Sequence, residues 1–307
     1  MNLMRVLDPF MPGAHLRRIR ELLANGSDVL RRPLVRQSVA LSDVPHWERF
    51  GSGRLTYWRR DPFGDYSACF REIPAFRQLV VSSQTTVTID IRQIQGMAAS
   101  KSDLHGHRCL DAWALDNAAW ALKDVSLPAV GHLLHWRRQD TASDSLVVHD
   151  YDGRVFLSNS EGSHRFAAAR YIAGQLGENV RFRAPLTRYS VDQTALRAIQ
   201  GEFAVYAVRH DARFMNALTD AFRAGGVPYL TCEMPPRLGG ADYGGSSGDA
   251  HRAILLPRAS HAASQVIALF DASPAMEVMS ELQRQCTAAL IPLDLADEEP
   301  EPFRPRI

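Results

Sequence analysis

The sequence contains very little lysine, and this shortage excludes the commonest kind of phosphate-binding motif. Lys101 and Lys123 are the only lysines in the chain. The glycine-rich stretch at 239–245 lacks the Gly-Lys-Ser/Thr ending of a Walker motif, so we interpret it as a linker or a mobile lid. A phosphate site would have to rely on arginine, whose planar guanidinium binds two oxygens at once.

Cysteine is also scarce, and its spacing excludes the usual metal and redox motifs. Cys69, Cys109, Cys232 and Cys286 lie far apart, with no CxxC pair and no zinc-ligand spacing. We expect four free thiols in a reducing compartment. No apolar run approaches the length of a bilayer, and residues 1–11 lack the continuous apolar segment of a signal peptide. We therefore expect a cytoplasmic protein without a membrane partner.

The overall charge does not indicate a particular class of binding partner. The chain of 307 residues carries a net charge of +1, so no general field attracts nucleic acid or membranes. Arginine is nevertheless concentrated in the first 60 residues, and acidic residues are concentrated in 294–307. Two interpretations are open, namely a solvated basic face with a disordered acidic tail, or a weak docking site for an acidic partner.

Hydrophobic periodicity predicts an α/β (α+β) fold. Val87, Ile89 and Ile91 alternate with polar residues and predict a strand over 79–94. The Asp-Gly pair at 152–153 separates two short apolar stretches, 146–149 and 155–158, and predicts a hairpin. Apolar residues at helical spacing predict a helix over 163–176, which Gly177 ends. A strand over 180–189 follows, and alternating strands and helices continue beyond it.

These elements suggest four segments. Residues 1–78 form a basic extension of helix and loop, and residues 79–192 form a core with a mixed sheet and helices. Residues 193–293 form a C-terminal α/β extension, and residues 294–307 form the acidic, disordered tail. The core contains the segments that carry chemistry.

The loop between the second hairpin strand and its helix is suited to binding an anion. Gly162 permits a tight turn and a close approach of a ligand to the backbone, and Ser163 can cap the helix. The free N–H groups of the first helical turn favour negative charge, and Arg165 can bind two phosphate oxygens. His164 adds a hydrogen-bond donor or a proton shuttle near neutral pH.

Glu161 is the unexpected member of this loop, because a carboxylate repels an anion. Its presence is explained if it holds Mg²⁺, orients a hydroxyl or caps the helix. A purely structural interpretation also fits the pattern. In that interpretation Ser163 caps the helix, Arg165 pairs with Glu161, and His164 packs.

The segment from the hairpin to the next strand resembles the signature of the ParB/sulfiredoxin superfamily. The matching parts are Asp152-Gly153, the strand at 155–157, the loop Glu161-Gly162-Ser163-His164-Arg165, the alanine-rich helix and the strand at 180–189. The resemblance covers about residues 80–190. It implies a nucleotide-binding fold with a mixed sheet, in which Gly162, Ser163, His164 and Arg165 bind the phosphates of ATP, CTP or another nucleotide.

Two departures narrow what the resemblance implies. Ser163 occupies the place of the catalytic thiol of sulfiredoxin, and a hydroxyl cannot perform that sulfur chemistry. No helix-turn-helix pattern follows the core, so chromosome partition is not expected either. The kinase branch of the superfamily takes an activating carboxylate from the region after the first strand, where this chain has Asp103 and Asp111.

The His105-Gly106-His107-Arg108 stretch lies in that same region. His105 or His107 could act as an acid or base, and Arg108 could be a second phosphate clamp. A His-x-His metal pair is an alternative without obvious further ligands. A plain polar loop leading into a helix is another.

The resulting hypothesis is a nucleotide-binding phosphotransferase or NTPase that uses ATP or another NTP with Mg²⁺. Glu161, Asp103, His107 and His164 are the candidate catalytic residues, and Glu161 is also the candidate metal ligand. The acceptor would be an unidentified small molecule or protein. A ParB-like nuclease or DNA-binding regulator that grips nucleic acid, and a non-catalytic nucleotide-sensing scaffold, are the alternatives.

Overall fold

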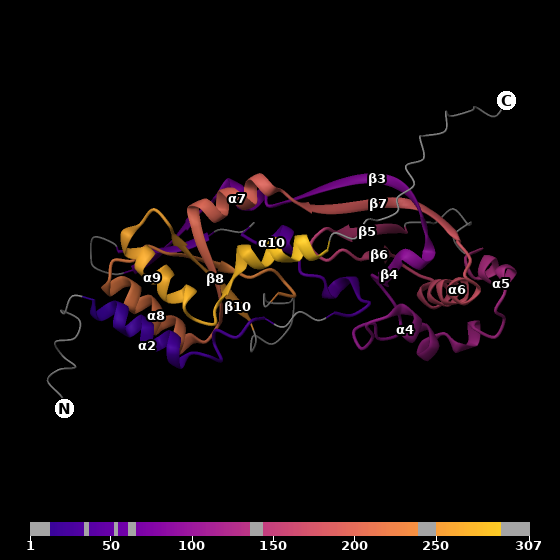
Figure 1. Ribbon diagram of the computed structural model, residues 1–307, viewed down its shortest axis with the longest axis horizontal. Helices are drawn as coiled ribbons and strands as arrows, with labels where there is room; N and C mark the ends of the chain where they lie inside the picture. The colour runs from indigo at the N-terminus through magenta and orange to yellow at the C-terminus, as the bar shows by residue number, and fades with distance from the viewer. Residues whose placement is uncertain are drawn as a thin grey trace, which may run out of the picture. The chain divides into compact units, whose positions relative to one another are not determined.

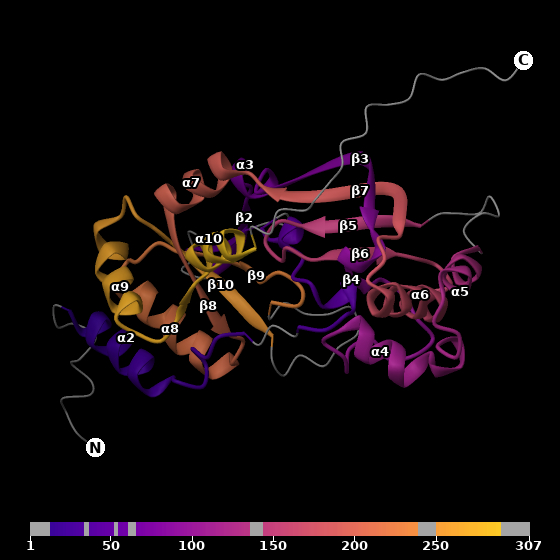
Figure 2. The ribbon, with the colours of Figure 1, turned by 45° about the vertical axis from the view of Figure 1, so that its right-hand side comes forward.

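A computed structural model describes residues 13–33, 37–51, 55–60, 66–135, 144–238 and 250–289. The glycine-rich stretch at 239–245 and the tail at 294–307 lie outside these residues. The chain divides into two units, drawn in Figures 1 and 2. The first contains Met1–Val35, Pro45–Val81 and Val191–Arg284, and the second contains Arg36–Val44, Ser82–Ser190 and Gln285–Ile307.

The first unit is built on a sheet in which six described strands follow the order β11-β8-β10-β9-β1-β2. The strands are β1 (Leu55–Arg60), β2 (Tyr66–Arg71), β8 (Phe203–Arg209), β9 (Leu230–Glu233), β10 (His251–Pro257) and β11 (Met276–Glu277). The helices of this unit are α2 (Ala14–Asn25), η3 (Trp47–Arg49), α3 (Pro74–Arg77), α7 (Gln193–Glu202), α8 (Ala212–Ala224), α9 (His261–Asp271) and most of α10 (Val278–Ala288).

Residues 1–78 and 193–293 were predicted as two separate segments, but most of both belong to this first unit, and only 36–44 and 285–293 belong to the second. Strand β1 pairs with β9 through Thr56 and Thr231, and α2 packs against α8 and α9. Their shared core contains Ile19 and Leu23 of α2 together with Leu218 and Phe222 of α8. The two segments therefore bury their apolar faces against each other, which local sequence patterns do not reveal.

The second unit has a mixed sheet in which five described strands follow the order β3-β7-β5-β6-β4. The strands are β3 (Val80–Asp90), β4 (Ile94–Met97), β5 (Ser145–His149), β6 (Val155–Ser158) and β7 (Arg181–Val191). The helices are η2 (Leu41–Asp43), η4 (Ile91–Gln93), α4 (Leu110–Asn117), η5 (Ala119–Ala121), α5 (Leu127–Leu133) and α6 (Ser163–Leu176).

The α/β fold class is confirmed, and so are the elements that flank the predicted anion site. Strands β5 and β6 pair antiparallel, and Gly153 between them has a positive φ of 79°. Helix α6 spans the predicted residues and ends at Gly177. The predicted strand over 79–94 is instead interrupted after Asp90, because Asp90 and Gln93 form a capping box around η4.

Helix α6 is held in the second unit by both apolar and polar contacts. Phe166, Ile172 and the alanines between them are buried in the core, and α6 packs against α4 and α5, as Figures 1 and 2 show. Arg170 donates hydrogen bonds to the carbonyls of Ile94 and Arg92 and pairs with Asp111. These contacts fix the helix beside strand β4.

Strands β4 and β6 are parallel neighbours. Because the carboxyl ends of parallel strands meet at the same edge of a sheet, the loops that follow β4 and β6 begin side by side. Helix α6 starts from the second of these loops. No described helix is both long and apolar enough to cross a bilayer.

The start of α6 depends on a glycine, and this dependence can be tested. Gly162 has φ 71°, in the left-handed region, where a side chain costs about 1–2 kcal/mol. We expect Gly162→Ala to lower the free energy of unfolding by about 1 kcal/mol. Gly174→Ala, in the exposed part of the same helix, should raise it by up to about 1 kcal/mol. Urea unfolding measures both, and equal stability of the two variants would contradict the assignment.

Candidate functional site

The loops after β4 and β6 are joined by the side chain of Asn159. Its amide oxygen accepts a hydrogen bond from the N–H of Ala99 (3.3 Å), and its amide nitrogen donates to the carbonyls of Ala99 (3.0 Å) and Glu161 (3.0 Å). The N–H of Ala98 also donates to the carbonyl of Leu157. Asn159 is 7% exposed, so these bonds are shielded from water. The two loops consequently form one connected structure.

Helix α6 begins in this structure without a side-chain cap. Gly162 is the N-cap residue, and Ser163 is the first residue of the helix. The prediction that Ser163 caps the helix is therefore wrong. The left-handed residue Gly162 occupies the N-cap position, and Ser163 already lies inside the helix. The hydroxyl of Ser163 is buried and donates to the hydroxyl of Ser100 (3.0 Å). The first-turn N–H groups thus have no capping side chain within the described residues.

His164 lies between the two loops with both ring nitrogens near serine hydroxyls. Its Nε2 is 3.0 Å from Oγ of Ser102, and its Nδ1 is 3.4 Å from Oγ of Ser163. The ring packs on Trp113 of α4, with 4.9 Å between centroids. Burial, and then the positive charge of Lys101, lower the pKa of His164 below its ordinary value. Both effects favour the neutral form of the imidazole.

The charged residues of the motif remain exposed around this centre. Glu161 and Arg165 are both exposed, and in the described part of the chain no ion pair joins them. Lys101, from the loop after β4, is exposed as well and is close enough to act on the His164 ring. Two parts of the structural interpretation, the Ser163 cap and the Arg165–Glu161 pair, are therefore wrong among the described contacts, whereas its third part, the packing of His164, is confirmed by the contact with Trp113.

Asp103, His105 and His107 are bonded to residues outside the loop at 159–162. His107 Nε2 lies 3.0 Å from the carboxylate of Asp116 on α4, and His105 Nδ1 lies 3.0 Å from Asp43. The carboxylate of Asp103 accepts from the N–H of His105 within its own turn. Arg108 is exposed. Hydrogen bonds to residues 159–164 come instead from the beginning of the loop after β4, from Ala99, Ser100 and Ser102.

The described residues offer few ligands for a metal ion. No group of three or more His, Cys, Asp or Glu side chains in the described residues is arranged to hold one. Mg²⁺ commonly binds through one or two carboxylates together with substrate phosphates. A Mg²⁺ ion that enters with a nucleotide could therefore use Glu161 as its protein ligand.

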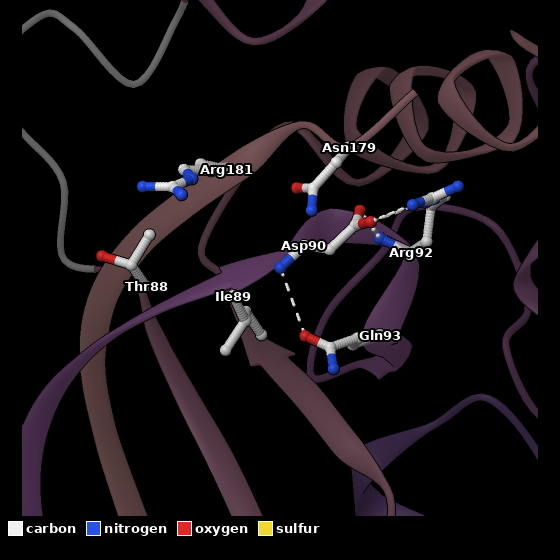
Figure 3. Close-up of a pocket in the computed structure, with 7 residues that line it drawn as sticks. All are labelled: Thr88, Ile89, Asp90, Arg92, Gln93, Asn179 and Arg181. Atoms are coloured by element: carbon white, nitrogen blue, oxygen red, sulfur yellow. Dashed lines mark hydrogen bonds and ion pairs between the residues drawn. The ribbon is translucent and has the colours of Figure 1, made fainter. Parts of the chain in front are cut away.

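A separate pocket of about 490 Å³ lies elsewhere in the second unit, lined by Thr88, Ile89, Asp90, Arg92, Gln93, Asn179 and Arg181. Figure 3 shows Asp90 bonded to both Arg92 and Gln93. The Asp90–Arg92 pair neutralises its own charge. The pocket holds no serine or histidine and none of the predicted residues, so the joined loops are the better candidate site.

Ser100, Ser102 and Asn159 were not predicted to be part of the site. Serine and asparagine are common in loops, and their types alone gave no signal. Ser100 and Ser102 could have been found by first predicting that the strands ending at 97 and 158 are parallel neighbours. That pairing is a long-range property, which one sequence does not display.

The electrostatic effect of Lys101 on His164 gives a direct prediction. Removing the positive charge in Lys101→Ala should raise the pKa of His164 toward its ordinary value, while burial still keeps it lowered. Histidine ring signals in an NMR pH titration report this pKa. Lys123→Ala, which removes the only other lysine, is the matched control and should leave it unchanged.

Because the folded-state pKa of His164 is lowered, its neutral form contributes stability above the unfolded pKa of about 6.5, and this contribution is lost as the pH falls. The Lys101→Ala variant should lose less stability on acidification than the wild type. An unchanged His164 pKa in this variant would contradict the placement of Lys101.

Comparison with known proteins identifies a family but not an activity. No curated protein and no solved structure shows significant similarity to the chain. One family model, described as a family of unknown function (DUF6685), matches residues 84–293. This match includes β4, the loop with Ser100 and Ser102 that follows it, the β5–β6 hairpin and α6. Because it spans more than half of the sequence, the chain belongs to the DUF6685 family.

Proposed function

We propose that the joined loops bind the phosphate groups of a nucleotide, ATP or another NTP, and that the protein transfers or hydrolyses the terminal phosphoryl group. The observation that carries the proposal is the start of α6, where an uncapped first helical turn lies beside the exposed side chain of Arg165. N–H groups and an arginine at a helix N-terminus form a favourable environment for phosphate oxygens.

The surroundings support this reading. Lys101 adds positive charge from the neighbouring loop, and His164 supplies a neutral imidazole that an arriving anion would make easier to protonate. The Asn159 bonds hold both loops in position before a ligand arrives, which lowers the entropy cost of binding. Phosphoryl transfer requires mainly positioning and charge neutralisation, and these residues supply both.

The order of elements also favours a ParB/sulfiredoxin-like second unit, which we include in the proposal. The β5–β6 hairpin, the loop at 159–162, helix α6 and strand β7 follow each other as in that superfamily. Glu161 would bind Mg²⁺ together with the nucleotide phosphates, and the acceptor would be a small molecule or a protein. We also propose a cytoplasmic location, because the four cysteines are free thiols.

Thermal unfolding with ATP, CTP or GTP and Mg²⁺ tests the proposal. A nucleotide at 100 times its dissociation constant should stabilise the protein by about 2.7 kcal/mol. Arg165→Ala should weaken binding at least tenfold, because Arg165 supplies a two-pronged contact to phosphate. Arg213→Ala is the matched control, since Arg213 is also exposed in the first turn of a helix, α8, whose N-terminus Asp211 caps.

Absence of a shift with any nucleotide, or an equal shift in Arg165→Ala, would contradict the proposal. Chromatographic detection of the nucleoside diphosphate separates an enzyme from a non-catalytic scaffold, which would bind without turnover. DNA binding that falls steeply with salt and survives without nucleotide would point instead to a regulator or nuclease.

A further inference from the structure

A serine hydroxyl faces a histidine across the two loops. Ser102 follows β4, and His164 is the second residue of α6. Oγ of Ser102 lies 3.0 Å from Nε2 of His164. Both side chains are partly exposed, so a reagent or substrate can reach them. A nucleophile within hydrogen-bond reach of a base is the geometry that covalent catalysis requires.

The surrounding bonds favour one direction for the hydrogen bond between Ser102 and His164. Ser163 donates its hydroxyl proton to Ser100 (3.0 Å), so the lone pairs of Ser163 are available to accept from Nδ1–H of His164 (3.4 Å). With the proton on Nδ1, Nε2 is unprotonated and must accept from Ser102. Ser100 in turn accepts from the N–H of Ser102 (3.1 Å). With Ser163 donating to Ser100, this direction satisfies every hydrogen bond of the network.

This direction distinguishes Ser102 from its neighbours. Ser163 is 6% exposed and gives its proton to Ser100, while Ser100 already accepts two hydrogen bonds. The hydroxyl proton of Ser102 is the one directed at an imidazole nitrogen. Ser163 takes the place of the third group that orients the base, although a neutral hydroxyl stabilises an imidazolium less than a carboxylate does.

We propose that Ser102 is a catalytic nucleophile that His164 activates, and that it accepts the terminal phosphoryl group of the nucleotide bound at α6. Oγ of Ser102 forms a bond to the γ-phosphorus, and the bond from that phosphorus to the β–γ bridging oxygen breaks. The proton of Ser102 passes to Nε2 of His164, and a nucleoside diphosphate leaves. The product is phosphoserine at 102. This step rests on the proposed nucleotide binding.

The position of α6 favours the step electrostatically. His164 belongs to the first turn of α6, so a phosphoryl group between Ser102 and His164 would lie next to the N–H groups that have no capping side chain. Lys101 precedes the nucleophile and is close to the same ring. Fixed donors that face developing negative charge lower the barrier without reorganising.

A serine-reactive fluorophosphonate probe tests the nucleophile without requiring a nucleotide. We expect the probe to label Ser102 of the full chain, as located by peptide mass spectrometry, and to label it at least tenfold more slowly in His164→Gln. Ser82→Ala, which removes an exposed serine on β3, is the control and should label at the wild-type rate. Incubation with ATP and Mg²⁺ should add a phosphoryl group at Ser102 and not in Ser102→Ala.

A second measurement uses the wild type, in case His164→Gln does not fold. Inorganic pyrophosphate should slow labelling of Ser102, because it occupies the adjacent phosphate site. No label on Ser102, or a rate that neither pyrophosphate nor His164→Gln changes, would overturn the inference. Nucleotide binding that persists in that case would leave the proposed function standing. A labelled Ser102 in a protein that binds no nucleotide would instead overturn the phosphoryl transfer together with the proposed function.

Discussion

The candidate site depends on the buried amide of Asn159. Parallel pairing of β4 with β6 starts two loops at one edge of the sheet, but pairing alone does not fix their paths. The Asn159 amide binds both backbone groups of Ala99 and the carbonyl of Glu161. Without these bonds the loop after β4 would be less firmly held beside the start of α6. The hydrogen bond between Ser102 and His164 would then be less firmly positioned.

The chemistry of the site follows from what those bonds leave available. An uncapped helix terminus and the exposed Arg165 and Lys101 favour an anion, whereas the exposed Glu161 disfavours one unless a cation accompanies it. Burial and Lys101 lower the pKa of His164 and so favour its neutral form, whose Nε2 can accept the Ser102 proton. In the proposed function, anion binding and proton transfer would thus involve the same few groups and should influence each other.

Local features of this region could be predicted from sequence, and long-range ones could not. The α6 helix, its glycine stop and the Asp-Gly hairpin follow from neighbouring residues, and all three were found. The hydrogen bond between Ser102 and His164 joins residues 62 positions apart in the sequence and depends on the pairing of β4 with β6. His107 was predicted to be a candidate acid or base, but its Nε2 lies 3.0 Å from the carboxylate of Asp116 on α4. The pairing of β1 with β9 could not be predicted either, because it too joins residues far apart in the sequence.

Amide NMR with inorganic phosphate tests the central claim most directly, because it locates the anion without assuming a nucleotide or a reaction. The account predicts shifts in the N–H signals of Ser163, His164 and Arg165, with smaller shifts at Ser102 through its bond to His164. Phosphate that moved no signal at the start of α6, or only signals around the pocket of Thr88 and Asn179, would contradict it.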